Sequence, residues 1–235
     1  MHQFLHDFSS PFAFRQVFPD IWSGFLINVH MMLIAEVLVL VLALLIAIVR
    51  GLPGRAAKPL RGLAILYTDF FRGTPLTIVA YAFILGLPGL RYAGISNYSS
   101  EVYGIIALTV VYTAYVTEVY RAGIESVHGS QRMAARSLGL SYGQALRYVV
   151  LPQAIRRVIP PLLNDFIGLQ KDTAIIGAIG VTEAAAQANN YASSYFNFTG
   201  FLVAAVLFVY LTIPLARFTD HMIKERELRE RAAMV

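Results

Sequence analysis

Long apolar segments separated by short polar ones dominate this chain. Each is close to the 20 or so residues that a helix needs to cross a hydrocarbon core of about 30 Å. Lipid offers no hydrogen-bond partners to the backbone, and the segments lack the alternation of barrel strands. The pattern therefore predicts an all-α membrane protein with five transmembrane helices, at about Trp22–Val49, Leu63–Leu87, Glu101–Tyr120, from just after Arg157 to Gly180, and Gly200–Phe218.

Composition supports a bilayer as the solvent. Hydrophobic residues make up 57% of the 235 and charged residues only 14%, against about 25% in typical soluble domains. Five spans leave room for short loops and tails, so a separate nucleotide-binding or catalytic domain is not expected. The absence of cysteine excludes thiolate nucleophiles, disulfides and cysteine-ligated metal sites.

The positions of the basic residues predict the topology. Most of the 19 lysines and arginines follow the first, third and fifth spans, whereas Arg15 and Arg91 lie on the opposite side. Cytoplasmic loops carry the excess of positive charge, so we expect the N-terminus outside and the C-terminus inside. This distribution accounts for the net charge of +5 without nucleic acid as a partner.

The chain divides into three parts on this interpretation. Residues 1–20 form an interfacial or irregular extracytoplasmic lead-in, and residues 21–222 form the transmembrane domain. A cytoplasmic loop over residues 125–152 interrupts that domain. Residues 223–235 form a charged cytoplasmic tail.

The long cytoplasmic loop has the pattern of two short helices joined by a glycine turn. Ser130 is a candidate N-cap for a helix through Ala134 and Ala135, and Gly139 stands where a left-handed residue would end it. Such a knob is suited either to docking in a groove of another protein or to packing on its own bundle.

The second helix of the loop starts with a capping box. Ser141 is followed three residues later by Gln144, a spacing at which each side chain bonds the other's backbone N–H. Pro152 is expected to limit this helix.

The segment MAARSLGLSYGQALRYVVLPQA resembles the EAA loop of ABC importer permeases. The matching positions are Ala134, Ala135, Gly139, Leu151 and Pro152, with Val149 in place of isoleucine and Met133 in place of glutamate. FRGTPL at 71–76 and NDFIGLQKDTAIIG at 164–177 resemble further hallmarks of the polar amino acid branch.

This resemblance implies a type I importer permease of the bacterial cytoplasmic (inner) membrane. Two permease chains, identical or similar, would form the path for polar amino acids. Two ATP-binding subunits would dock on the coupling loop, and an extracytoplasmic substrate-binding protein would deliver substrate. ATP and magnesium would be used by the partner ATPase. We therefore do not expect this chain to be an enzyme or to bind a cofactor. It indeed carries no Gly-x-x-x-x-Gly-Lys-Ser/Thr phosphate loop.

Met133 is the departure within the coupling loop that changes the chemistry, since valine for isoleucine at Val149 is conservative. A glutamate there would close a capping box with Ser130, worth roughly 0.5–1 kcal/mol, and would offer a carboxylate to the ATPase. Methionine does neither, so we expect a weaker helix start with docking by shape.

Ionisable residues within the spans need a partner or a wet cavity. Glu118 and Arg121 are three residues apart, as are Asp69 and Arg72, so two ion pairs are predicted, with a role of Glu118 in the substrate path as the alternative. Pro75 also leaves a backbone carbonyl free one turn earlier, and this carbonyl is a candidate for lining a cavity.

The fourth span carries the deepest polar groups. Asn164 and Lys171 are almost two helical turns apart, so they share a face about 10 Å long, with Asp172 beside them. They either face the second permease or line the substrate path. Thr113 and Thr117, one turn apart on the third span, either add hydroxyls to that path or pack between helices.

Two other classes of protein compete with this interpretation. An ion-coupled secondary amino acid transporter would normally show an internal repeat and more spans. An intramembrane metalloenzyme would need clustered ligands, whereas the five histidines are scattered and no metal site is predicted. Co-purification with an ATPase subunit would separate the importer from both.

Overall fold

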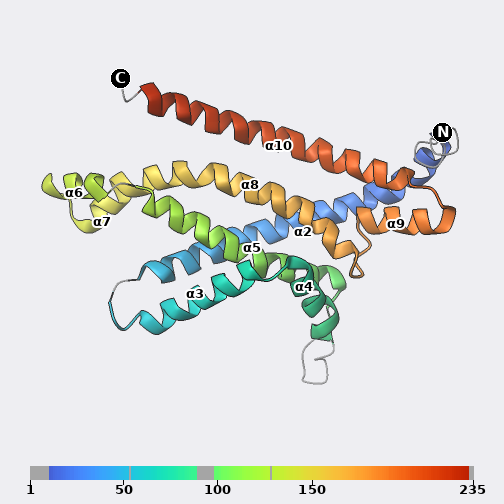
Figure 1. The fold of residues 1–235 in the computed structure, drawn as a ribbon, viewed down its shortest axis with the longest axis horizontal. Coiled ribbons are helices and arrows are strands. Elements are labelled where there is room, and N and C mark those ends of the chain that lie inside the picture. Colours follow the sequence, from blue (N-terminus) through green and yellow to red (C-terminus); the bar gives the residue numbers. More distant parts are fainter. Residues whose placement is uncertain (1–10, 53, 89–97, 128, 233–235) are drawn as a thin grey trace.

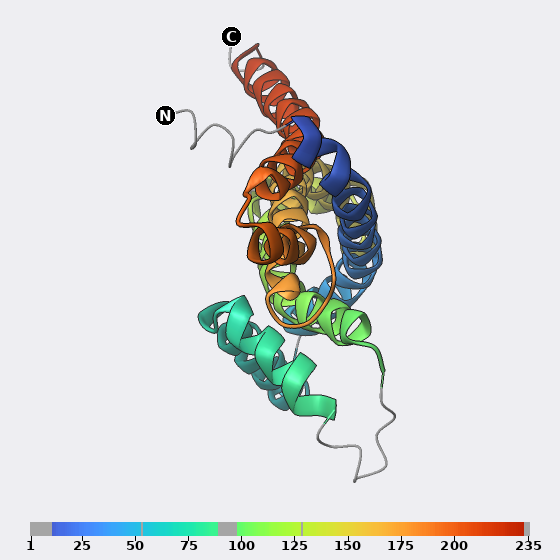
Figure 2. The ribbon, with the colours of Figure 1, turned by 90° about the vertical axis from the view of Figure 1, so that its right-hand side faces the viewer.

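The computed structural model describes residues 11–52, 54–88, 98–127 and 129–232, and these are helical with short connections. Four long helices run side by side along the length of the molecule (Figure 1). They are α2 (Pro11–Gly51), α5 (Ser100–Glu125), α8 (Leu151–Gly177) and α10 (Thr199–Ala232). Viewed end-on, α3 (Lys58–Gly73) and α4 (Leu76–Tyr81) form an arm at one edge (Figure 2).

The core lies where α2, α5 and α8 meet. Small residues such as Ala35, Ala43 and Ala107 are completely buried there, which lets helix backbones approach closely in a membrane protein. Large apolar residues of α2, such as Val37 and Leu45, are more than half exposed. An apolar surface of this kind fits lipid rather than water as the surrounding medium.

Among the described residues, three helices are long and apolar enough to cross a membrane. They cover Pro11–Gly51, Ser100–Glu125 and Thr199–Glu225, and they contain the predicted first, third and fifth spans. The interpretation of an irregular lead-in is wrong for residues 11–20, because α2 begins at Pro11 and continues through Pro19. Residues 1–10 lie outside the described part, as does Arg91.

The predicted second span is not one continuous helix. Helix α3 ends at Gly73, Thr74 is extended with φ −102° and ψ 129°, and α4 starts after Pro75. Proline lacks an N–H and disfavours helical geometry at the residue before it, which explains the break. Helix α4 then continues into a π-helical turn, η1 (Ala82–Gly86).

The fourth predicted span begins earlier than expected. Helix α8 starts at Leu151 and keeps Pro160 and Pro161 in its interior. Arg156 and Arg157 are therefore part of this helix and do not lie in a loop before it. Charged residues make α8 less apolar than the three helices above, although its 27 residues match the length of a span.

A buried polar clamp fixes α9 (Ala184–Tyr195) to the bundle. The carboxylate of Glu183 accepts hydrogen bonds from the amides of Ala185 (2.9 Å) and Ala186 (2.7 Å) and from the side-chain amide of Asn28 (2.9 Å). A Cβ on Gly177 would lie 1.8 Å from Oε1 of Glu183. Only glycine at that position therefore lets α8 approach the clamp so closely.

Candidate functional site: a docking knob and a cavity beside it

One end of the bundle carries a compact knob formed by α6 (Gly129–Ser137), α7 (Tyr142–Ala145) and the π-helical turn η3 (Leu146–Val150) (Figure 1). Gly139 has φ +86°, as predicted for a left-handed helix end. Its N–H donates to the carbonyl of Arg136 (3.0 Å), and the N–H of Leu140 donates to that of Ala135 (3.2 Å). The paired bonds close the end of α6.

The start of α6 differs from the prediction. The helix already includes Gly129, so Ser130 lies in its first turn and is not the N-cap. A glutamate at position 133 therefore would not close a capping box with Ser130. The position before Gly129 lies outside the described residues.

The two alanines of the knob have different roles. Ala134 is exposed, whereas Ala135 is 4% exposed and packs inside the chain. Met133 (66% exposed) on α6 and Leu138 (84% exposed) just after its end are further exposed apolar side chains. The exposed surface of the knob therefore includes large apolar side chains, beside exposed polar residues such as Gln131 and Arg136.

The second half of the knob has the predicted capping box. The N–H of Ser141 donates to Oε1 of Gln144 (2.8 Å), and the N–H of Gln144 donates to Oγ of Ser141 (3.3 Å). Pro152 does not end this helix, because η3 joins α7 to α8 without a break. The wider π turn makes room for the proline ring, which has no N–H to donate. Leu151 and Pro152 are the first residues of α8.

A small apolar cluster holds the knob to the bundle. Val127, Val150 and Ala154 are buried together, with Ile124 and Leu146 packed against them. The side-chain amide of Gln153 also donates to Oε1 of Gln131 (2.6 Å) across the turn. A force on the knob therefore acts directly on the ends of α5 and α8.

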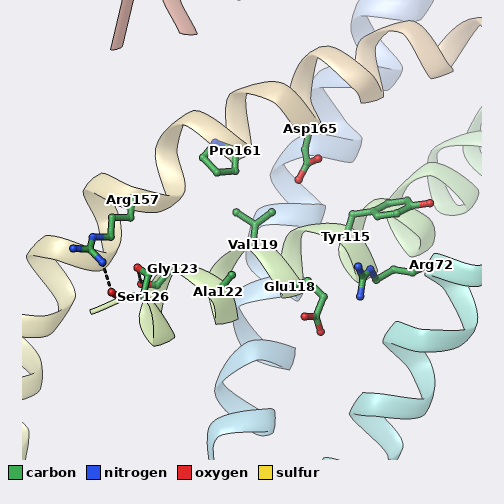
Figure 3. Close-up of a pocket in the computed structure, with 10 residues that line it drawn as sticks. All are labelled: Arg72, Tyr115, Glu118, Val119, Ala122, Gly123, Ser126, Arg157, Pro161 and Asp165. Atoms are coloured by element: carbon green, nitrogen blue, oxygen red, sulfur yellow. Dashed lines mark hydrogen bonds between the residues drawn. The ribbon is translucent and has the colours of Figure 1, made fainter. Parts of the chain in front are cut away.

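A cavity of about 450 Å³ lies between α3, α5 and α8, on the side of the knob (Figure 3). Its walls are polar at both ends and apolar between them. The lining residues are Arg72 from α3, Tyr115, Glu118, Val119, Ala122 and Gly123 from α5, Ser126, and Arg157, Pro161 and Asp165 from α8.

The cavity was not predicted from the sequence. The sequence does show the regular spacing of several residues that line it. Arg157, Pro161 and Asp165 recur every four residues, and Tyr115 and Val119 are likewise four apart. Residues at this interval share one face of a helix. What the sequence does not show is that these two faces oppose each other.

Glu118 is held by two arginines. Arg121 donates to Oε2 from Nε (2.9 Å) and Nη2 (2.7 Å), which confirms the predicted pair. Arg50 of α2 also donates to Oε1 of Glu118, and the same nitrogen donates to the hydroxyl of Thr68 (3.0 Å). Arg50 is 68 residues from Glu118, so local spacing gave no sign of this contact.

Neither Arg72 nor Asp165 has an ion-pair partner of this kind among the described residues. The predicted pair of Asp69 with Arg72 is absent from the described structure, where Arg72 is exposed and reaches the cavity (Figure 3). Oδ2 of Asp165 is buried without a hydrogen-bond partner in the described part of the chain. At the other end, Arg157 donates to the carbonyl of Ser126.

The polar residues predicted for a substrate path lie outside the cavity. Asn164 and Lys171 are both exposed on α8, so they face away from this chain's core. Asp172 accepts a hydrogen bond from the hydroxyl of Tyr112 (2.8 Å).

Thr113 and Thr117 are buried where α5 packs on α2. They are 1% and 0% exposed, and the hydroxyl of Thr117 donates to the carbonyls of Thr113 (2.6 Å) and Ala43 (3.4 Å). Of the two predicted roles, packing between helices agrees with this arrangement.

Sequence comparisons place the chain among transport proteins. Residues 40–226 match the family model described as "Binding-protein-dependent transport system inner membrane component". The chain is 39% identical over 173 residues to the probable glutamine ABC transporter permease protein GlnM of Bacillus subtilis (strain 168), covering 72% of this chain and 77% of that protein. It is 31% identical over 211 residues to the glutamate/aspartate import permease protein GltJ of Escherichia coli (strain K12), covering 84% and 85%.

A solved structure has the same fold. "Crystal structure of an amino acid ABC transporter with histidines" superposes with a TM-score of 0.82 at 29% identity, over 92% of this chain and 98% of that one. The chain therefore belongs to the family of binding-protein-dependent transport system inner membrane components, the permeases of ABC importers.

Proposed function

We propose that this chain is the membrane-spanning subunit of an ATP-driven importer for polar amino acids in a bacterial inner membrane. The observation that carries the proposal is the knob, which exposes the apolar side chains of Met133, Ala134 and Leu138 at the end of a bundle whose surface is apolar. The relatives named above include permeases for glutamine and for glutamate and aspartate, which supports the substrate class.

In this proposal the knob faces the cytoplasm and docks in a groove of an ATP-binding subunit. The N-terminus is then extracytoplasmic and the C-terminus cytoplasmic. Five segments cross the membrane: the three apolar helices, the α3–α4 pair, and α8. ATP and magnesium belong to the partner ATPase, and a binding protein delivers substrate from outside.

A second permease chain completes the translocation path. Asn164 and Lys171, exposed on one face of α8, would be costly in lipid. They therefore face the second chain or the path between the two chains. Leucine at either position distinguishes these roles: a loss of uptake in intact complexes supports the path, and separation into single permease chains supports the dimer contact.

The test of the function is reconstitution with the ATPase subunit and binding protein. Proteoliposomes should take up amino acid only when ATP and the loaded binding protein are present. An ion gradient without ATP should give no uptake. Uptake driven by the gradient alone would instead identify an ion-coupled secondary transporter.

A further inference from the structure

The knob and the first turns of α8 carry positive charge with no negative charge among it. Between Glu125 and Asp165 the sequence contains no aspartate or glutamate, and its charged residues are Arg132, Arg136, Arg147, Arg156 and Arg157. The end of α10, by contrast, mixes both signs over residues 217–231. The positive-inside rule accounts for the arginines, but it does not exclude acidic residues, which contribute little to topology. The missing carboxylates therefore need another reason.

Three of these arginines are exposed and unpaired. Arg136 lies in the last turn of α6, Arg147 in η3 and Arg156 in α8, and all three are exposed. None of the ion pairs formed by the described residues involves them. The carboxylate that precedes the knob in sequence, Glu125, is bound by Arg121. The charge of the three arginines is therefore not neutralised within the described part of the chain.

The arginines of the knob lie beside large exposed apolar side chains. Met133 is one helical turn before Arg136 on α6, and it is 66% exposed. The guanidinium of Arg147 lies 5.8 Å from the ring centroid of Tyr148, which is exposed as well. Arginine, methionine and aromatic residues are the types enriched in protein–protein interfaces. The composition of the exposed knob therefore indicates a protein as its partner.

The position of the knob also favours a protein over the membrane surface. Figure 1 shows α6 and α7 beyond the end of α2 along the long axis of the molecule. Helix α2 is the most apolar of the three helices that could cross a membrane. The knob therefore lies past the surface that lipid covers.

We propose, on the basis of the importer function above, that the knob selects an ATP-binding subunit whose docking groove is lined by carboxylates. Arg136 and Arg147 pair with aspartate or glutamate side chains at the rim of the groove, and Met133 contacts its apolar floor. Arginine suits this pairing because its planar fork matches a carboxylate. Charge is thereby added to the docking by shape that the sequence predicts.

A single sign of charge also excludes wrong partners. Complementary charges speed association, and like charges brought together across an interface cost several kcal/mol. A groove lined by lysine or arginine would place cations against the exposed guanidinium groups of the knob. The knob therefore discriminates among ATP-binding subunits by the sign of charge in their grooves.

The test is the Kd of the purified full-length permease for its ATP-binding subunit in a neutral detergent. We expect the affinity to fall by about tenfold or more between about 50 and 500 mM NaCl, because salt screens exposed charges. Arg136→Gln combined with Arg147→Gln should weaken binding by about tenfold or more at low salt and remove most of the salt dependence. Lysine at both positions should restore part of the affinity and the salt dependence, because it keeps the charge without the fork. A loss caused by misfolding would not be restored in this way.

Arg55→Gln combined with Lys58→Gln is the matched control. It removes two positive charges from the connection between α2 and α3, where both side chains are exposed, and it leaves the knob unchanged. We expect the affinity to change by less than about twofold. An equal loss in this control would show that only the net charge matters, which contradicts pairing with individual arginines.

Met133→Glu tests the sign of the groove directly. It places a carboxylate on an exposed position three residues before Arg136 and should weaken docking by about tenfold, whereas Met133→Gln should change it by less than about threefold. Tighter binding of Met133→Glu would identify a basic groove and overturn the proposal.

Uptake by reconstituted vesicles separates this proposal from the proposed function. If wild-type vesicles take up amino acid with ATP and binding protein, but the Kd depends neither on salt nor on the two arginines, the importer function stands and the acidic groove is wrong. An unchanged Kd together with hydrolysis that responds to phosphatidylglycerol only in the wild type would assign the arginines to anionic lipid and also overturn the proposal. Wild-type vesicles without ATP-dependent uptake would remove the proposed function itself.

Discussion

Replacing Gly139 with valine tests whether the knob couples the permease to its ATPase. Gly139 has φ +86°, and a Cβ built there would meet no atom within 4 Å. The cost of a side chain is therefore conformational rather than steric. A left-handed residue with a Cβ costs about 1–2 kcal/mol, and valine, being β-branched, is among the least tolerant. This corresponds to a roughly 5- to 30-fold shift away from the native turn.

The assay follows from this magnitude. Gly139→Val should weaken binding of the purified ATPase subunit by about 5- to 30-fold and reduce stimulated hydrolysis in vesicles, with membrane insertion unchanged. Gly139→Asn should retain most of the activity, because asparagine tolerates the left-handed region. Gly143→Val is the control, because Gly143 lies in α7 with open space around it. Full stimulated hydrolysis in Gly139→Val would show that the knob is only a connector.

Three further predictions test the bundle. Arg50→Ala leaves Glu118 with Arg121 alone and should lower stability by about 1–3 kcal/mol, measured as a reduced melting temperature of the purified complex. Gly177→Ala places a Cβ 1.8 Å from a clamp oxygen and should cost about 1–3 kcal/mol, whereas Gly62→Ala, with open space around it, should not lower the melting temperature. A reporter fused after Val235 should be active in the cytoplasm, and activity only outside the cell would reverse the topology.

Local patterns predicted those parts of the fold that depend on neighbours in sequence. The long α5, the glycine that ends α6 and the Ser141–Gln144 box all follow from residues within one or two turns. The break before Pro75 could have been predicted from the same sequence, because proline restricts the residue before it. It was missed because the residues on both sides are apolar and together have the length of one span. The start of α6 was misplaced because a serine near a helix start need not be its cap.

Contacts between distant segments could not be predicted in this way. Arg50 reaches Glu118 across 68 residues, and Asn28 reaches Glu183 across 155. Such pairs depend on how helices pack, which one sequence does not specify. The cavity has the same origin, because its two walls come from helices whose relative rotation is set only in the folded bundle.

The connection between the knob and the bundle determines how a displacement of the knob is transmitted to the other helices. Residues 142–177 form α7, η3 and α8 in succession with no intervening loop, so no flexible linker separates the second half of the knob from the residues deep in the bundle. At about 1.5 Å per residue this rod is about 54 Å long. A displacement of α7 in the knob would therefore be passed along one continuous helical segment to Asp165, whereas Arg72 lies on a separate helix, α3. The spacing of α8 and α3 across the cavity is thus tied to the position of the knob, without any hinge between α7 and α8.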